Sequence, residues 1–129
     1  MTPLHRKSKL RRKSKSPLRK AIDAADKALQ DWHRAKYPDA KCEACGGKFE
    51  VCHHYIEKHS SARLRYCEGN LIFLCHKCHA SHHFGNVGVM SKVILKRGQK
   101  WLNGILKLSR EKGQINQYIA EQILEKYKI

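Results

Sequence analysis

The sequence predicts an α+β fold, in which a small core of two short strands and one helix is flanked by helices at both ends. Three observations support this prediction. Apolar residues recur at three- and four-residue steps near both ends of the chain, and two short apolar runs in the middle have the length of strands. Two C-x-x-C pairs enclose those runs.

The composition indicates a small basic protein. With 129 residues, the chain has room for one modest core with extensions. Its net charge of +16 comes from 27 Lys and Arg against 11 Asp and Glu, which favours a polyanionic partner such as nucleic acid. No apolar run reaches the length of a membrane span, and no secretory signal opens the chain. We therefore expect a cytoplasmic protein.

The N-terminal part divides into a tail and a helix. Residues 1–15 are a run of Lys, Arg and Ser with too little apolar content to fold alone, so we expect a disordered basic tail. Arg11, Arg12 and Lys13 in this tail are candidate nucleic-acid contacts. Ser16 and Pro17 are typical of a helix start, and the residue before Pro38 disfavours helix. We therefore expect a helix over residues 16–37.

The middle of the chain, residues 38–86, should form the core. Residues 49–53 and 71–74 are strand candidates, and residues 56–69 between them are polar and irregular. A short helix should follow over residues 76–84. Residues 87–129 show three apolar helical faces separated by Gly98 and Gly113, so we expect a helical C-terminal segment. Its apolar faces could pack on the core or pair two chains.

The two C-x-x-C pairs predict a structural zinc site. Each pair presents two thiolates from one turn, and two such pairs complete a tetrahedral four-sulfur site. The four expected ligands are Cys42, Cys45, Cys75 and Cys78. Cys52 and Cys67 lie outside the pairs and are expected to be small buried residues.

A second group of polar residues suggests a catalytic metal site. His79 and His83 are four residues apart on the expected helix, so their side chains reach one point. His53 and His54 end a strand, where neighbouring side chains diverge, so one can bind a metal while the other addresses a substrate. Histidine can act as a general base near neutral pH, and the Asn70 amide could orient that base or join the metal shell.

The order and spacing of these residues over residues 42–83 resemble the HNH, or ββα-metal, endonuclease family. The resemblance implies a ββα-metal core with His53, His79 and His83 as metal ligands. It assigns His54 as the general base and Asn70 as a positioning residue. It also implies 5′-phosphate and 3′-hydroxyl products. His82 is a rival to His83, because a step of three residues also reaches the same helix side.

A second set of residues extends past this core, and it comprises Leu64, Arg65, Tyr66, Glu68, Asn70, Gly85, Asn86, Ile94, Arg97 and Gly98. These residues carry a narrower resemblance, over about residues 25–127, to the phage NinG/Rap recombination nucleases, which act on branched DNA such as Holliday junctions. This resemblance implies a phage-encoded protein in the bacterial host cytoplasm. A generic small phage HNH nuclease is the alternative within this class.

The sequence therefore predicts a metal-dependent DNA endonuclease, a phosphodiester hydrolase acting on duplex or branched DNA. Imidazole ligands suit Zn²⁺, Ni²⁺ or Mn²⁺ at the catalytic site, whereas Asn70 and water suit Mg²⁺. Lys58, Arg63 and Arg65 are candidate phosphate contacts in the loop. The alternative is a noncatalytic zinc-stabilised DNA-binding protein, which needs the cysteines and the basic charge but not the histidines. A homodimer would suit symmetric junctions.

Overall fold

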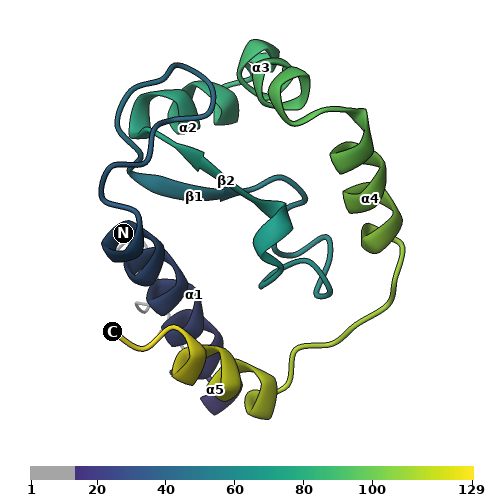
Figure 1. The fold of residues 1–129 in the computed structure, drawn as a ribbon. Coiled ribbons are helices and arrows are strands. Elements are labelled where there is room, and N and C mark those ends of the chain that lie inside the picture. Colours follow the sequence, from purple (N-terminus) through teal and green to yellow (C-terminus); the bar gives the residue numbers. More distant parts are fainter. Residues whose placement is uncertain (1–13) are drawn as a thin grey trace, which may run out of the picture.

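The computed structural model describes residues 14–129 and has the mixed α+β architecture that the sequence predicts (Figure 1). Of the expected basic tail over residues 1–15, residues 1–13, with Arg11, Arg12 and Lys13, lie outside the described residues. No helix in the described part combines the length and apolar character that crossing a bilayer requires. The elements are α1 (Pro17–Lys36), β1 (Val51–His54), the 3₁₀ turn η1 (Glu68–Asn70), β2 (Leu71–Leu74), α2 (His76–His83), α3 (Val87–Arg97), α4 (Gln99–Ser109) and α5 (Gln117–Lys126).

Helix α1 begins and ends where the sequence predicts. The Ser16 hydroxyl accepts a hydrogen bond from the Arg19 N–H at 3.1 Å, and Pro17 occupies the first turn, where its missing N–H is not needed. The helix stops at Lys36, and the Tyr37 N–H still donates to the carbonyl of His33. Ala25, Leu29 and His33, at four-residue steps, form its buried face.

Strands β1 and β2 form an antiparallel pair in which His53 lies opposite Ile72 and His54 lies opposite Leu71. Strand β2 spans the predicted residues 71–74, whereas β1 starts two residues later than predicted. The reason is that the Phe49 N–H donates to the Ala40 carbonyl at 3.1 Å, and this bond attaches Phe49 to the preceding cysteine turn instead of to β2.

The two faces of this hairpin lie on two different cores. One face packs against α2 and α3, and the other packs against α1 and α5, as Figure 1 shows. Consecutive strand residues point to opposite faces, so the hairpin contributes to both cores at once. The first core comprises Cys42, Ile72, Leu74, Cys75, Val89, Met90 and Val93, and the second comprises Leu29, Phe49, Cys52, Leu71 and Tyr127.

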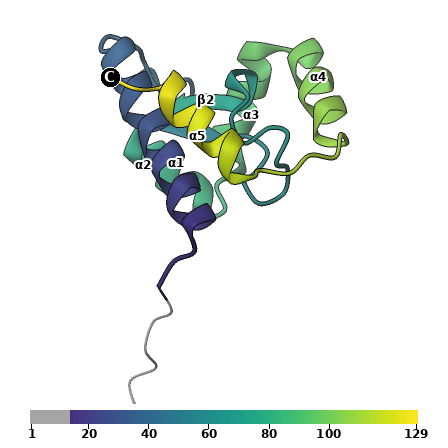
Figure 2. The same ribbon diagram turned by 90° about the horizontal axis from the view of Figure 1, so that it is seen from below.

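The C-terminal helices carry the chain around the core and back to its start. Gly98 separates α3 from α4 with φ of +94°, a left-handed backbone that glycine adopts without strain. After α4 an extended segment leads to α5, which packs along α1 (Figures 1 and 2). Tyr127 just beyond α5 is fully buried, so the end of the chain is part of the second core.

Candidate metal centres

The four predicted cysteine ligands converge. The sulfur atoms of Cys42, Cys45, Cys75 and Cys78 all lie within 4.8 Å of one another. The Cys45 and Cys75 sulfurs are 3.7 Å apart. Two sulfurs bound at about 2.3 Å to one tetrahedral zinc ion would be about 3.8 Å apart, so this donor set fits a structural zinc ion.

Local backbone structure places these sulfurs. The Cys42 N–H donates to the Gly47 carbonyl at 2.6 Å, and Gly46 adopts φ of +78° to close the first turn. The second pair opens α2, where the Cys75 sulfur accepts a hydrogen bond from the Cys78 N–H at 3.3 Å. Burial raises the pKa of the Cys42 thiol, but surrounding backbone N–H groups outweigh this effect and lower the pKa to about 7. The thiolate that zinc requires is therefore accessible near neutral pH.

The two remaining cysteines do not join this cluster. Cys52 is buried in the second core, where burial raises the pKa of its thiol to about 12. Cys67 is partly buried just before η1. Neither belongs to the four-sulfur group that the described residues form.

Three predicted histidine ligands also converge. Candidate ligand nitrogens of His53, His79 and His83 lie within 4.8 Å of one another. The Nε2 atoms of His79 and His83 are 3.0 Å apart, the spacing expected when two nitrogens bind one ion at about 2.1 Å and about 90°. The Nε2 atom of His53 is buried and has no hydrogen-bond partner. A buried imidazole nitrogen without a partner is costly, and a bound metal ion would satisfy it. This donor set therefore fits a divalent transition metal.

The surroundings of His53 and His79 favour neutral rings. Burial is the main cause that lowers the pKa of His53, to about 3, and the neighbouring imidazoles add to the effect. Burial and the same neighbours lower the pKa of His79. Neutral imidazole is the form that binds metal, so the site is prepared for an ion at neutral pH.

His82 lies close to the cluster but outside its ligand set. Its ring centroid is 4.8 Å from that of His53, closer than the 5.5 Å of His83. The ligand nitrogens that converge are nevertheless those of His53, His79 and His83. The geometry thus favours His83 over its rival.

His54 lies on the other face of β1 and is held by the loop. Its Nε2–H donates to the backbone carbonyl of Arg65 at 2.8 Å. Because a carbonyl can only accept, Nε2 carries the hydrogen and Nδ1 keeps its lone pair. Burial lowers the pKa of His54, which favours the neutral ring. His54 is therefore arranged to accept a proton through Nδ1.

Asn70 is fully buried and engages the backbone of the β1–β2 loop. Its Oδ1 accepts from the Ile56 N–H at 2.8 Å, and its Nδ2 donates to the carbonyls of Ile56 at 3.0 Å and Leu64 at 3.3 Å. These three bonds hold the amide on the loop backbone, and Asn70 is not among the residues that line the histidine cleft. They fix the loop next to Arg65, whose carbonyl orients His54. This arrangement favours the positioning role over membership in the metal shell.

The structure gives Arg65 a different environment from the predicted phosphate contact. The Arg65 side chain is only 10% exposed, and its guanidinium binds both carboxylate oxygens of Asp26 on α1, at 3.1 and 2.5 Å. A guanidinium engaged in this way inside the protein has little surface left for DNA. We therefore assign Arg65 to the support of His54 and no longer to phosphate binding.

A cleft of about 690 Å³ lies beside the histidines. His53, His54, His79 and His83 line one part of it, together with Lys58 and His59 from the loop. Helix α1 forms another wall with Lys27, Gln30, Asp31 and Arg34. The apolar periodicity of α1 identifies the side of the helix that faces the core. Nothing in the local sequence indicates that its polar side faces the histidines. The sequence therefore did not single out the α1 residues.

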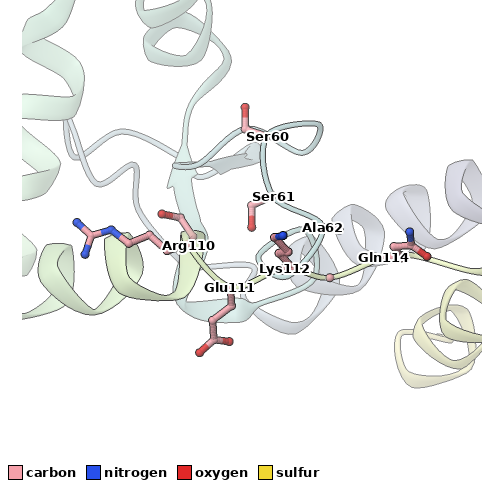
Figure 3. A pocket seen from close by; sticks show the side chains of 9 residues that line it. Ser60, Ser61, Ala62, Arg110, Glu111, Lys112 and Gln114 are labelled. Carbon is pink, nitrogen blue, oxygen red and sulfur yellow. The ribbon is translucent and has the colours of Figure 1, made fainter.

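Another hollow, of about 600 Å³, lies where the segment between α4 and α5 passes the β1–β2 loop (Figure 3). It contains no cysteine or histidine, and Figure 3 shows Arg110 and Glu111 projecting away from Ser60. At this crossing the exposed Arg63 pairs with Glu111 at 3.0 Å. Arg63 thus lies away from the histidine cleft, and its contact with DNA stays a prediction.

Comparison with known protein families supports the narrower of the two resemblances. The family model described as Bacteriophage Lambda NinG protein matches residues 4–129. Comparison with curated proteins and with solved structures gives no match. The family match covers the tail, both candidate metal centres and the C-terminal helices. With nearly its whole length matched, the chain belongs to the phage NinG family.

Proposed function

We propose that this protein is a metal-dependent DNA endonuclease that hydrolyses phosphodiester bonds in branched DNA during phage recombination. One observation carries the proposal: the ligand nitrogens of His53, His79 and His83 converge, with the unpartnered Nε2 of His53 among them, in the same cleft as His54. A protein that only bound DNA would have no use for this arrangement. Membership of a phage family supports the recombination role and a place of action in the host cell.

The chain's own residues supply the general base and the contacts that orient it. His54 accepts a proton at Nδ1 from the attacking water, while its Nε2–H stays on the Arg65 carbonyl. Asn70 and the ion pair between Arg65 and Asp26 keep that carbonyl in place. The water oxygen bonds to phosphorus as the bond to the 3′ oxygen breaks. The departing 3′ oxygen takes a proton from solvent water, which leaves a 5′-phosphate and a 3′-hydroxyl.

A divalent ion held by His53, His79 and His83 would stabilise the negative charge that develops on the phosphate and the leaving oxygen. The separate four-cysteine site would hold a structural zinc ion and take no part in the chemistry. The two donor sets share no residue. The two sites should therefore be able to load different ions.

The test uses supercoiled plasmid and a synthetic four-way junction, each with Mg²⁺, Mn²⁺ or EDTA. The wild-type protein should cut in the presence of the metal and prefer the junction. His54→Ala should cut at least about 100-fold more slowly, because it removes the general base. Its circular dichroism spectrum and its affinity for DNA should match the wild type. The matched control is His76→Ala, which removes a 69% exposed histidine that does not line the cleft and should keep full activity.

Each outcome decides between functions. Normal cleavage by His54→Ala would exclude the assigned base. Equal cutting of plasmid and junction would favour a generic phage nuclease over a branch-directed one. Tight binding by both proteins, with no cleavage under any metal, would identify a zinc-stabilised DNA-binding protein instead.

A further inference from the structure

The polar face of α1 contributes two basic side chains and one amide to the lining of the histidine cleft. Lys27, Gln30 and Arg34 follow one another at three- and four-residue steps, so they share one side of the helix, and all three line the cleft. The Lys27 side chain is 77% exposed and that of Arg34 is 42% exposed. Both cations are therefore accessible to a ligand in the cleft.

A side-chain bridge fixes this helix face against the strand that carries the histidines. The Gln30 Nε2 donates to the Cys52 carbonyl at 2.7 Å, and its Oε1 accepts from the Cys52 N–H at 2.8 Å. Gln30 thus pairs with the free edge of β1 as a neighbouring strand would. Cys52 directly precedes His53, so the α1 cations are held at a set position relative to the histidine cluster.

Asp31 holds the two cations in the free protein. One of its carboxylate oxygens pairs with Lys27, and the other accepts from Arg34 Nη2 at 2.7 Å. The side chain of Asp31 is itself 34% exposed, so these ion pairs are in contact with water and are individually weak. A phosphate group, with more acceptor oxygens than a carboxylate, can take over both partners. Asp31 therefore acts as a counter-ion that a DNA strand would displace.

We propose that Lys27 and Arg34 form a second DNA-backbone site, which holds a phosphate adjoining the one at the histidine cluster. This inference rests on the proposed nuclease function, which identifies the ligand as a DNA strand. What it adds is that α1 forms part of the binding surface. The loop contributes Lys58 to the same cleft, and the acidic groups that face the site are Asp31 and Glu57. Through this site, α1 takes part in DNA binding as well as supporting the fold.

The experiment measures DNA binding without cleavage, in zinc-loaded protein of the His54→Ala background. The double variant Lys27→Gln/Arg34→Gln should bind a duplex or a four-way junction about tenfold more weakly at moderate salt. The slope of log affinity against log salt should fall by about 2, because two phosphate contacts are lost. Asp31→Asn should shift affinity in the opposite direction, since it frees both cations and removes a negative charge from the cleft.

The matched control is Lys100→Gln/Lys107→Gln, which removes the same charge from α4, on the opposite side of the molecule from α1 (Figures 1 and 2). The proposal predicts a clearly smaller loss of affinity for this control. An equal loss in both double variants would mean general charge attraction and would overturn it. Unchanged binding by Lys27→Gln/Arg34→Gln, or weaker binding by Asp31→Asn, would also overturn it, provided that circular dichroism shows each variant folded.

Kinetics in the otherwise wild-type background separate this proposal from the nuclease assignment. If the protein cuts DNA, Lys27→Gln/Arg34→Gln should raise KM and leave kcat nearly unchanged, because the lost contacts lie away from the reacting phosphate. If the protein binds but never cuts, the nuclease proposal fails while the binding and salt measurements still decide the role of α1.

Discussion

At the scale of single residues, the pleat of β1 separates two chemical roles. His53 points toward α2 and meets His79 and His83, whereas His54 points toward the loop and the Arg65 carbonyl. Consecutive strand residues face opposite sides, so one strand presents both the proposed metal ligand and the proposed proton acceptor, and both line one cleft. A one-residue shift in the pairing with β2 would exchange the two histidines.

The first prediction concerns Asn70, whose amide holds the loop. Asn70→Asp replaces the Nδ2 donor with an oxygen that faces the carbonyls of Ile56 and Leu64. Two hydrogen bonds become repulsive contacts, so the free energy of unfolding should fall by about 1–3 kcal/mol. Urea unfolding of the zinc-loaded protein measures this loss.

Asn103→Asp is the control for that substitution, because Asn103 is exposed on α4 and its oxygen still accepts from Gln99. We expect its stability to stay within about 0.5 kcal/mol of the wild type. An Asn70→Asp protein as stable as this control would show that the loop does not depend on the amide.

At the scale of elements, α2 joins the two candidate metal centres. Its first turn carries Cys75 and Cys78, and the following turns carry His79 and His83. None of its residues is fully buried, so α2 has little apolar anchorage of its own. A zinc ion at its N-terminus would therefore fix the helix and with it the two histidines.

This arrangement predicts different effects for the two kinds of cysteine. Cys45→Ser should abolish the stoichiometric zinc, lower the thermal midpoint and reduce any binding of a second metal, because α2 loses its attachment. Cys67→Ser, outside the cluster, should keep one zinc per chain. Elemental analysis and thermal unfolding test both variants. Full zinc content in Cys45→Ser would exclude the four-sulfur site.

At the scale of the whole molecule, the chain closes on itself through α5 and α1. Tyr127 is fully buried beside Trp32, with ring centroids 5.3 Å apart, and its hydroxyl donates to Glu68 at 3.0 Å. Glu68 begins η1, the turn that contains Asn70. The C-terminus thus supports both α1 and the entry to β2, and through them the two sides of the histidine cleft.

We therefore predict that Tyr127→Ala destabilises the protein by about 3–5 kcal/mol, the usual cost of deleting a buried aromatic ring. Tyr118→Ala removes a 68% exposed ring from α5, the helix that precedes Tyr127, and should change stability by less than about 0.5 kcal/mol. Chemical denaturation of the two variants measures the difference. Equal stabilities would show that the closure by α5 contributes little to the fold.

The sequence predicted much of the local structure because the signals are local. Ser16 and Pro17 mark the start of α1, Gly98 separates two helices, and residues 71–74 form the predicted strand. The first strand was placed too early, because a backbone bond from Phe49 to Ala40 competes with the sheet. That competition depends on the cysteine turn and leaves no mark in the apolar pattern.

The sequence by itself determined which donor atoms this protein possesses and at what spacing, since the two members of a C-x-x-C pair, or two histidines four residues apart on a helix, approach each other through local geometry. Only the tertiary structure decided that the two cysteine pairs meet, that His53 joins His79 and His83, and what supports these clusters. It turned Arg65 inward to Asp26, paired Gln30 with the edge of β1, and closed α5 over α1. These contacts join residues far apart in the chain, and each depends on burial and packing that form only when the whole fold assembles.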